Sequence, residues 1–141
     1  MKILLAADGS EFTRRAAEYL VSLVGKLAQH PQIHLLNVHA PVPYPRAASA
    51  AGRDLVKTYH EEECAAALAV AEGVLGKAGL AFESLWIAGV AGAEIAAYAA
   101  KHGIEMIVMG SHGHGKLRTL ALGSVANDVL REAKSPVLIV K

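Results

Sequence analysis

The sequence is poor in cysteine and in aromatic residues. Cys64 is the only cysteine among 141 residues, so no disulfide bond can form within the chain. A single thiol agrees with a reducing compartment, and its alanine-rich surroundings indicate a small core residue rather than a nucleophile. Phe, Trp and Tyr make up 5% of the residues. This composition suits helices that pack closely against a sheet.

Long runs of basic residues and long runs of apolar residues are also missing. The formal net charge is +1, and without a basic patch neither a nucleic acid nor a membrane surface is an expected partner. The apolar stretch at residues 1–7 is too short for a signal peptide and ends at Asp8. No stretch is long enough to cross a bilayer. We therefore expect a cytoplasmic protein.

The residues that are present predict one well-buried domain over residues 1–141. The chain is 53% hydrophobic and 19% charged, which argues against disorder. Apolar runs predict strands at residues 2–7, 33–38, 82–87, 104–109 and 136–140. Helical spacing of apolar residues predicts helices at residues 12–27, 55–78, 93–100 and 125–133, and prolines mark residues 40–52 as a loop. Strands joined by helices indicate an α/β fold with a parallel sheet.

Two glycine-containing loops follow predicted strands, where parallel sheets bind ligands. The first is Asp8-Gly9-Ser10. The second runs from Gly110 to Lys116, with Arg118 further on, and the pair at residues 123–124 precedes the last predicted helix. Glycines let backbone N–H groups approach an anion, and a helix N-terminus adds partial positive charge. These loops predict a phosphate site.

One phosphate-binding motif can be rejected from the spacing. Residues 110–116 fit the pattern G-x-x-x-x-G-K, but Leu117 stands where a P-loop needs Ser or Thr for magnesium. The chain after Leu117 is also too short for the rest of a P-loop core. No G-x-G-x-x-G follows a strand, so the nicotinamide and flavin fingerprint is absent as well.

A different spacing is more specific. Gly110, two residues, Gly113, nine residues, Gly123 and then Ser124 resembles the ATP-binding signature of the universal stress protein family. The resemblance covers the whole chain. Its further motifs are KILLAADGS at 2–10, LLNV at 35–38, IVMGSHG at 107–113, LGSVA at 122–126 and SPVLIV at 135–140.

The resemblance implies both a fold and a set of ligand contacts. The fold would be a single doubly wound, Rossmann-like sandwich, with five parallel strands in the order 3-2-1-4-5 and four flanking helices. The ligand would be ATP, with or without Mg²⁺, and two copies would pair through their last strands as a homodimer. Asp8 would contact the nucleoside, and the backbone of Ala7 and Val38 would meet the adenine. The ribose and phosphates would lie against Met109, Gly110, His112, Gly113, His114, Gly123, Ser124 and Val125.

Simpler interpretations stay open beside these. Asp8 fits a cap of the first helix, Ser124 fits a cap of the last one, and the glycines fit ordinary turns. The pairs His112 and His114, and His34 and His39, invite a metal interpretation. However, nothing supplies further ligands at a recognised spacing, so we predict no metal site.

The leading functional hypothesis is an ATP-binding stress-response protein whose nucleotide biases its conformation or its choice of a protein partner. One rival is a nucleotide-independent scaffold of the same fold. The other is a slow ATP-hydrolysing or phosphoryl-transfer enzyme, for which Asp8, His112 and His114 are the candidate bases. Because the sequence shows no committed base and no set of magnesium ligands, we assign no catalytic residue.

Overall fold

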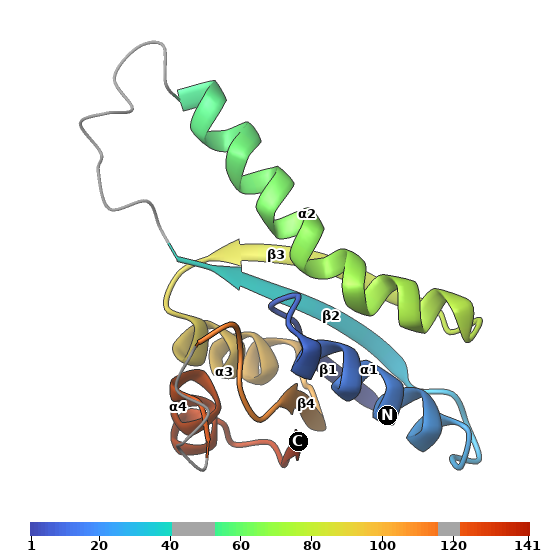
Figure 1. Ribbon diagram of the computed structural model, residues 1–141. Helices are drawn as coiled ribbons and strands as arrows, with labels where there is room; N and C mark the ends of the chain where they lie inside the picture. Colours follow the sequence, from blue (N-terminus) through green and yellow to red (C-terminus); the bar gives the residue numbers. More distant parts are fainter. Residues whose placement is uncertain (41–52, 116–121) are drawn as a thin grey trace.

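The computed structural model describes residues 1–40, 53–115 and 122–141, with side chains from residue 60 onward in the second range. Figure 1 shows the elements along the chain. They are β1 (Lys2–Ala6), α1 (Glu11–Val24), β2 (Gln32–His39), α2 (Arg53–Lys77), β3 (Phe82–Ala88), α3 (Ala91–His102), β4 (Met106–Gly110), α4 (Ser124–Glu132) and β5 (Val137–Val140). Residues 41–52 of the predicted loop at 40–52 lie outside the described residues, as do Lys116 and Arg118.

The sheet has the strand order β3-β2-β1-β4-β5, and all four pairings are parallel. This confirms the predicted order 3-2-1-4-5. β1 lies in the middle, and the chain moves outward from it in one direction through β2 and β3 and in the other through β4 and β5. The strand order therefore reverses between β1 and β4, and their carboxyl ends frame a crevice.

Each face of the sheet is covered by a pair of helices, as Figure 1 shows. Along β1, Ile3 and Leu5 pack into the cluster beneath α1 and α2. Leu4 and Ala6 alternate with them and pack into the cluster beneath α3 and α4. This period of two explains why an unbroken apolar run forms a strand buried on both faces. Each leucine fully buried here contributes about 1.5–3 kcal/mol of transfer free energy.

Identifiable caps mark the start of α1 and the end of α3. Ser10 caps α1, since its Oγ accepts a hydrogen bond from the Thr13 N–H at 3.3 Å. The prediction that Asp8 caps this helix is therefore wrong: the cap comes two residues later, and the Asp8 carboxylate serves the loop instead. Gly103 ends α3 in the left-handed conformation, with φ of 64°, and confirms the predicted stop.

Several predicted boundaries shift by a few residues. α1 ends at Val24 rather than near residue 27, because Gly25 closes it with hydrogen bonds to the carbonyls of Val21 and Leu23. β4 begins at Met106, two residues later than predicted. None of the helices in the described residues is both long and apolar enough to cross a membrane.

Candidate ligand-binding site

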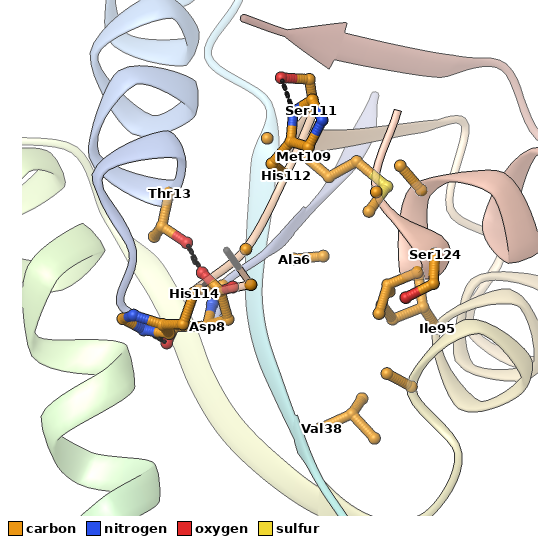
Figure 2. A pocket seen from close by; sticks show the side chains of 18 of the residues that line it. Ala6, Asp8, Thr13, Val38, Ile95, Met109, Ser111, His112, His114 and Ser124 are labelled. Atoms are coloured by element: carbon orange, nitrogen blue, oxygen red, sulfur yellow. Dashed lines mark hydrogen bonds between the residues drawn. The ribbon is translucent and has the colours of Figure 1, made fainter. Parts of the chain in front are cut away.

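A pocket of about 480 Å³ opens at the carboxyl ends of β1, β2 and β4, against the N-termini of α3 and α4. Figure 2 shows it from close by. The structure brings every predicted ligand-site residue to this one pocket. The residues are Ala7, Asp8, Val38, Met109, Gly110, His112, Gly113, His114, Gly123, Ser124 and Val125. They come from three strand ends and one helix, although more than a hundred positions separate the first from the last.

The inner wall of the pocket is apolar, and most of its residues could not be assigned to a site from the sequence. Small and branched side chains form this wall, some of them visible around the open space in Figure 2: Ala6, Leu36, Val38, Ile95, Met109 and Ala126. Most of these residues had been assigned only to strand or helix patterns, because periodicity does not tell which core residues border a cavity. The arrangement supplies an apolar slot that can bury a ring system.

The backbone of Val38 offers an unpaired edge to this slot. The Ala7 N–H donates to the Leu36 carbonyl at 2.9 Å, while the His39 carbonyl accepts from the Gly89 N–H at 2.9 Å. Leu36 and Val38 therefore turn their polar groups toward β1, and the alternate residues turn toward β3. Since β1 ends at Ala6, the N–H and C=O of Val38 have no backbone partner among the described residues.

The backbone of Ala7, in contrast, is already occupied. Its N–H donates to the Leu36 carbonyl, and its own carbonyl accepts from Asn37 Nδ2 at 2.7 Å. A free donor and acceptor pair for a ligand is therefore present at Val38, whereas at Ala7 only the second lone pair of the carbonyl is left to accept a hydrogen bond. On the other side of the sheet, beneath α2, the Oδ1 of Asn37 is buried and has no hydrogen-bond partner among the described residues.

Asp8 is held in place on one side. Its Oδ1 accepts from the Ser10 N–H at 2.9 Å and from the Thr13 hydroxyl at 2.7 Å. Figure 2 draws the second of these bonds. Oδ2 has no hydrogen-bond partner among the described residues and lies against the Cα of Gly113. A fixed carboxylate with one unused oxygen beside a pocket is suited to accept a hydrogen bond from a ligand.

The signature glycines are needed for contacts with the protein itself. A Cβ added at Gly110 would lie 2.5 Å from the Cβ of Phe12, in the first turn of α1. A Cβ at Gly113 would overlap Asp8 Oδ2. Gly123 packs against Ser111 and His112 and donates its N–H to the Ser111 carbonyl at 2.8 Å. The glycines thus let the β4–α4 loop approach the β1–α1 loop, which brings the pocket walls together.

The first turn of α4 points unpaired amides toward the pocket. The cap residue is Gly123, which makes no side-chain cap hydrogen bond, and the first bond within the helix runs from Asn127 N–H to the Gly123 carbonyl at 3.0 Å. Ser124 is therefore the first helical residue and not the predicted cap. The backbone N–H groups of residues 124–126 have no partner among the described residues. Such a helix N-terminus attracts anions.

The two histidines of the β4–α4 loop have different surroundings. His114 Nε2 lies 2.8 Å from the Asp8 carbonyl, so its ring bridges the two loops. Because that carbonyl can only accept, Nε2 carries the proton. His112 Nδ1 lies 3.1 Å from Ser111 Oγ, and its ring packs at 5.3 Å from the ring of Phe12. Both histidines border the pocket, but only His112 borders it beside the α4 N-terminus.

The other histidines and the cysteine lie outside this pocket. His34 is buried, with Nδ1 at 2.8 Å from the Tyr98 hydroxyl, and His39 Nε2 lies 3.7 Å from Glu63. Within the ranges that the structure describes, no group of three or more His, Cys, Asp or Glu side chains could hold a metal ion. Burial, with a smaller contribution from Glu63, raises the pKa of the Cys64 thiol. That shift suits a core residue and opposes a thiolate nucleophile.

Comparison with known proteins gives a family for this arrangement. The sequence profile of the universal stress protein family matches residues 1–141. The chain is 30% identical over 141 residues to the universal stress protein MJ0531 of Methanocaldococcus jannaschii, covering 81% of that protein. It is 32% identical over 137 residues to the universal stress protein Slr1230 of Synechocystis, but spans only 41% of that relative's length.

Solved structures show the same fold. That of the protein MJ0577 superposes with a TM-score of 0.81 at 27% identity, covering 99% of this chain and 94% of the other. A universal stress protein in complex with cAMP matches with a TM-score of 0.74 at 22% identity, covering 100% of this chain and 97% of the other. One from Archaeoglobus fulgidus in complex with dAMP matches with 0.65 at 22% identity, covering 100% and 98%.

Proposed function

The chain belongs to the universal stress protein family, and from this premise we propose that its pocket binds an adenine nucleotide, ATP in the first instance. The protein would act in the stress response as a nucleotide-dependent regulator. The observation that carries the proposal is the first turn of α4, whose unpaired amides open onto a pocket with an apolar inner wall. An apolar slot that ends in a phosphate-binding helix terminus fits a base joined to phosphates.

The base would enter the apolar slot and use the open edge of Val38. Adenine presents a hydrogen-bond donor and an acceptor side by side, and the N–H and C=O of Val38 offer the complementary pair without a competing backbone partner. Ile95 and Met109 would cover the ring faces. The relatives that hold cAMP and dAMP support an adenine nucleotide in a pocket of this fold.

The phosphates would lie at the N-terminus of α4. Their charge would be met by the backbone amides, the partial positive charge of the helix end and the hydroxyl of Ser124. Asp8 is the only carboxylate among the lining residues that the structure describes. Because Mg²⁺ prefers several oxygen ligands from protein and phosphate together, the described residues give it little beyond the phosphates themselves. We propose binding rather than catalysis.

The proposal extends to the assembly of the protein. β5 lies at the edge of the sheet, and its side chains are half-buried. An apolar edge strand pairs readily with another strand, so two copies would join through β5 as a homodimer. Nucleotide occupancy would then bias which protein partner the dimer binds, and the protein would work in the cytoplasm.

A pair of substitutions at one position tests the phosphate site. Ser124 is the first residue of α4 and follows Gly123, whose backbone is extended, with ψ of 161°. Proline is favoured at this helix position and accepts an extended residue before it. Ser124→Pro therefore deletes one amide donor while it keeps the helix, and Ser124→Ala deletes only the hydroxyl.

We expect Ser124→Pro to weaken ATP binding by about 10- to 100-fold, since a hydrogen bond to a charged group contributes about 1.5–3 kcal/mol. Ser124→Ala should have the smaller effect. Isothermal titration calorimetry gives the dissociation constants, and circular dichroism verifies that the helix content is unchanged. Equal affinities for Ser124→Pro and the unmodified protein would contradict the phosphate site.

A further inference from the structure

The hydroxyl of Thr13 holds the Asp8 residue at two points. Thr13 Oγ1 accepts a hydrogen bond from the Asp8 N–H at 3.0 Å and donates one to Asp8 Oδ1 at 2.7 Å. Thr13 lies in the first turn of α1, and 2% of its surface is exposed. Its own N–H donates to Ser10 Oγ, so the residue is tied into the cap of the helix. Figure 2 shows Thr13 on α1, joined to Asp8 by a hydrogen bond, and both residues border the pocket.

This arrangement determines which oxygen of Asp8 is available. Ser10 N–H and Thr13 Oγ1 both donate to Oδ1, so this oxygen is engaged. Oδ2 is left at the pocket, between the β1–α1 loop and Gly113. An aspartate side chain on a loop normally loses rotational freedom when it binds a ligand, and that loss weakens binding. Two hydrogen bonds from α1 remove much of that freedom before any ligand arrives.

We propose that Thr13 is a positioning residue for ligand recognition. It fixes the carboxylate of Asp8 so that Oδ2 accepts a hydrogen bond from a donor on the nucleoside, either a ribose hydroxyl or the exocyclic amine. A phosphate cannot be that partner, because a carboxylate and a phosphate repel each other. The inference rests on the proposed nucleotide site and adds a residue that touches the ligand only through Asp8.

The chemistry of threonine fits this role. A hydroxyl is the smallest side-chain group that can accept from one atom of Asp8 and donate to another at the same time. Valine has the same shape and can do neither, whereas serine can do both with less restriction of its side chain. Because the group is buried, water does not replace the lost bonds in the valine variant.

The test compares Thr13→Val and Thr13→Ser with the unmodified protein. Ser135→Ala serves as a matched control, since its hydroxyl donates to the Ile104 carbonyl at 2.7 Å, away from the pocket residues. Calorimetry gives the affinity for ATP, 2′-deoxy-ATP, 3′-deoxy-ATP and inosine triphosphate, which lacks the exocyclic amine. The same titrations are repeated in an Asp8→Ala background, and thermal unfolding shows the fraction of folded protein.

We expect Thr13→Val to weaken ATP binding about tenfold or more, Thr13→Ser to restore most of the affinity, and Ser135→Ala to leave it unchanged. In the Asp8→Ala background, Thr13→Val should have no further effect. The analogue that lacks the group contacted by Asp8 should bind the unmodified protein weakly, and Thr13→Val should not weaken its binding further. That analogue identifies the nucleoside group that Asp8 contacts.

Two results would overturn the inference while the nucleotide site stands. One is an unchanged affinity of Thr13→Val for ATP. The other is that Thr13→Val loses the same affinity for ATP and for all three analogues, and that this loss persists in the Asp8→Ala background. Thr13 would then only stabilise the loop. Failure of the unmodified protein to bind any of the four nucleotides would instead refute the proposed function, and this inference with it.

Discussion

Gly110 provides a sharp test of why glycine is needed at the end of β4. A Cβ at this position would lie 2.5 Å from the Cβ of Phe12 and 2.9 Å from its carbonyl carbon. Carbon atoms in contact prefer separations of about 3.5–4.0 Å. The Phe12 backbone belongs to α1, which packs across β4, so Gly110→Ala must push a helix and a strand apart. Overpacking of this kind costs about 1–3 kcal/mol.

The expected result is a lower melting temperature. For a domain of this size, each kcal/mol shifts the midpoint by about 3 °C, so Gly110→Ala should lower it by roughly 3–9 °C in a calorimetric scan. Gly73→Ala is the matched control, because Gly73 lies within α2, near its C-terminal end, and a Cβ there meets no atom within 4 Å. Alanine favours a helix over glycine by about 1 kcal/mol. Gly73→Ala should therefore raise the midpoint. If Gly110→Ala proved as stable as the unmodified protein, this glycine would not serve packing.

Three further predictions concern the site, the assembly and pH. Gly113→Ala should displace Asp8 Oδ2 and weaken ATP binding about tenfold in calorimetry, and an unchanged affinity would contradict the contact between the two loops. The N–H of Ile139 points away from β4, since the Val140 carbonyl accepts from Ser111 on that side. Ile139→Pro should thus yield monomers in light scattering where the unmodified protein gives dimers, and dimers in both would exclude pairing through β5. Burial, with a smaller contribution from Glu83, raises the pKa of Tyr98, so folding stability should fall as pH rises above about 10, where the unfolded side chain loses its proton first. Tyr98→Phe should lessen that loss of stability in denaturant titrations at several pH values. An unchanged dependence of the free energy of unfolding on pH would contradict this prediction.

The fold could be predicted from the sequence to a large extent. Alternating apolar runs and helical stripes gave the layers, and the family resemblance implied the strand order that the structure shows. The helix ends were less predictable. Asp8, Ser10 and Thr13 are all suitable residues near the start of α1, and only the geometry shows that Ser10 caps while Thr13 reaches back to Asp8. Competing local hydrogen bonds of similar strength leave such choices open in a sequence.

The loop residues of the candidate site could be predicted from the sequence, whereas most residues of its apolar wall could not. The glycine spacing led to residues of the β1–α1 and β4–α4 loops, which the structure places around one pocket. Leu36 and Ile95 carry no such signal, because a core residue beside a cavity has the same pattern as one in a filled core. The reason for Gly113 was also different from the expected one, since its closest neighbour is Asp8. Contacts between loops that are far apart in the sequence produce no pattern in the local sequence of either loop.

The most direct test of the account is whether the purified protein binds ATP at this pocket. Nucleotide released on denaturation is identified first, and the stripped protein is then titrated with ATP in a calorimeter beside Gly113→Val, which places a larger side chain against Asp8. We predict saturable binding at roughly micromolar affinity, about −8 kcal/mol, and its loss in the variant. The absence of binding heat, together with no binding in an independent equilibrium assay, would contradict the nucleotide site and leave the protein as a scaffold of the same fold.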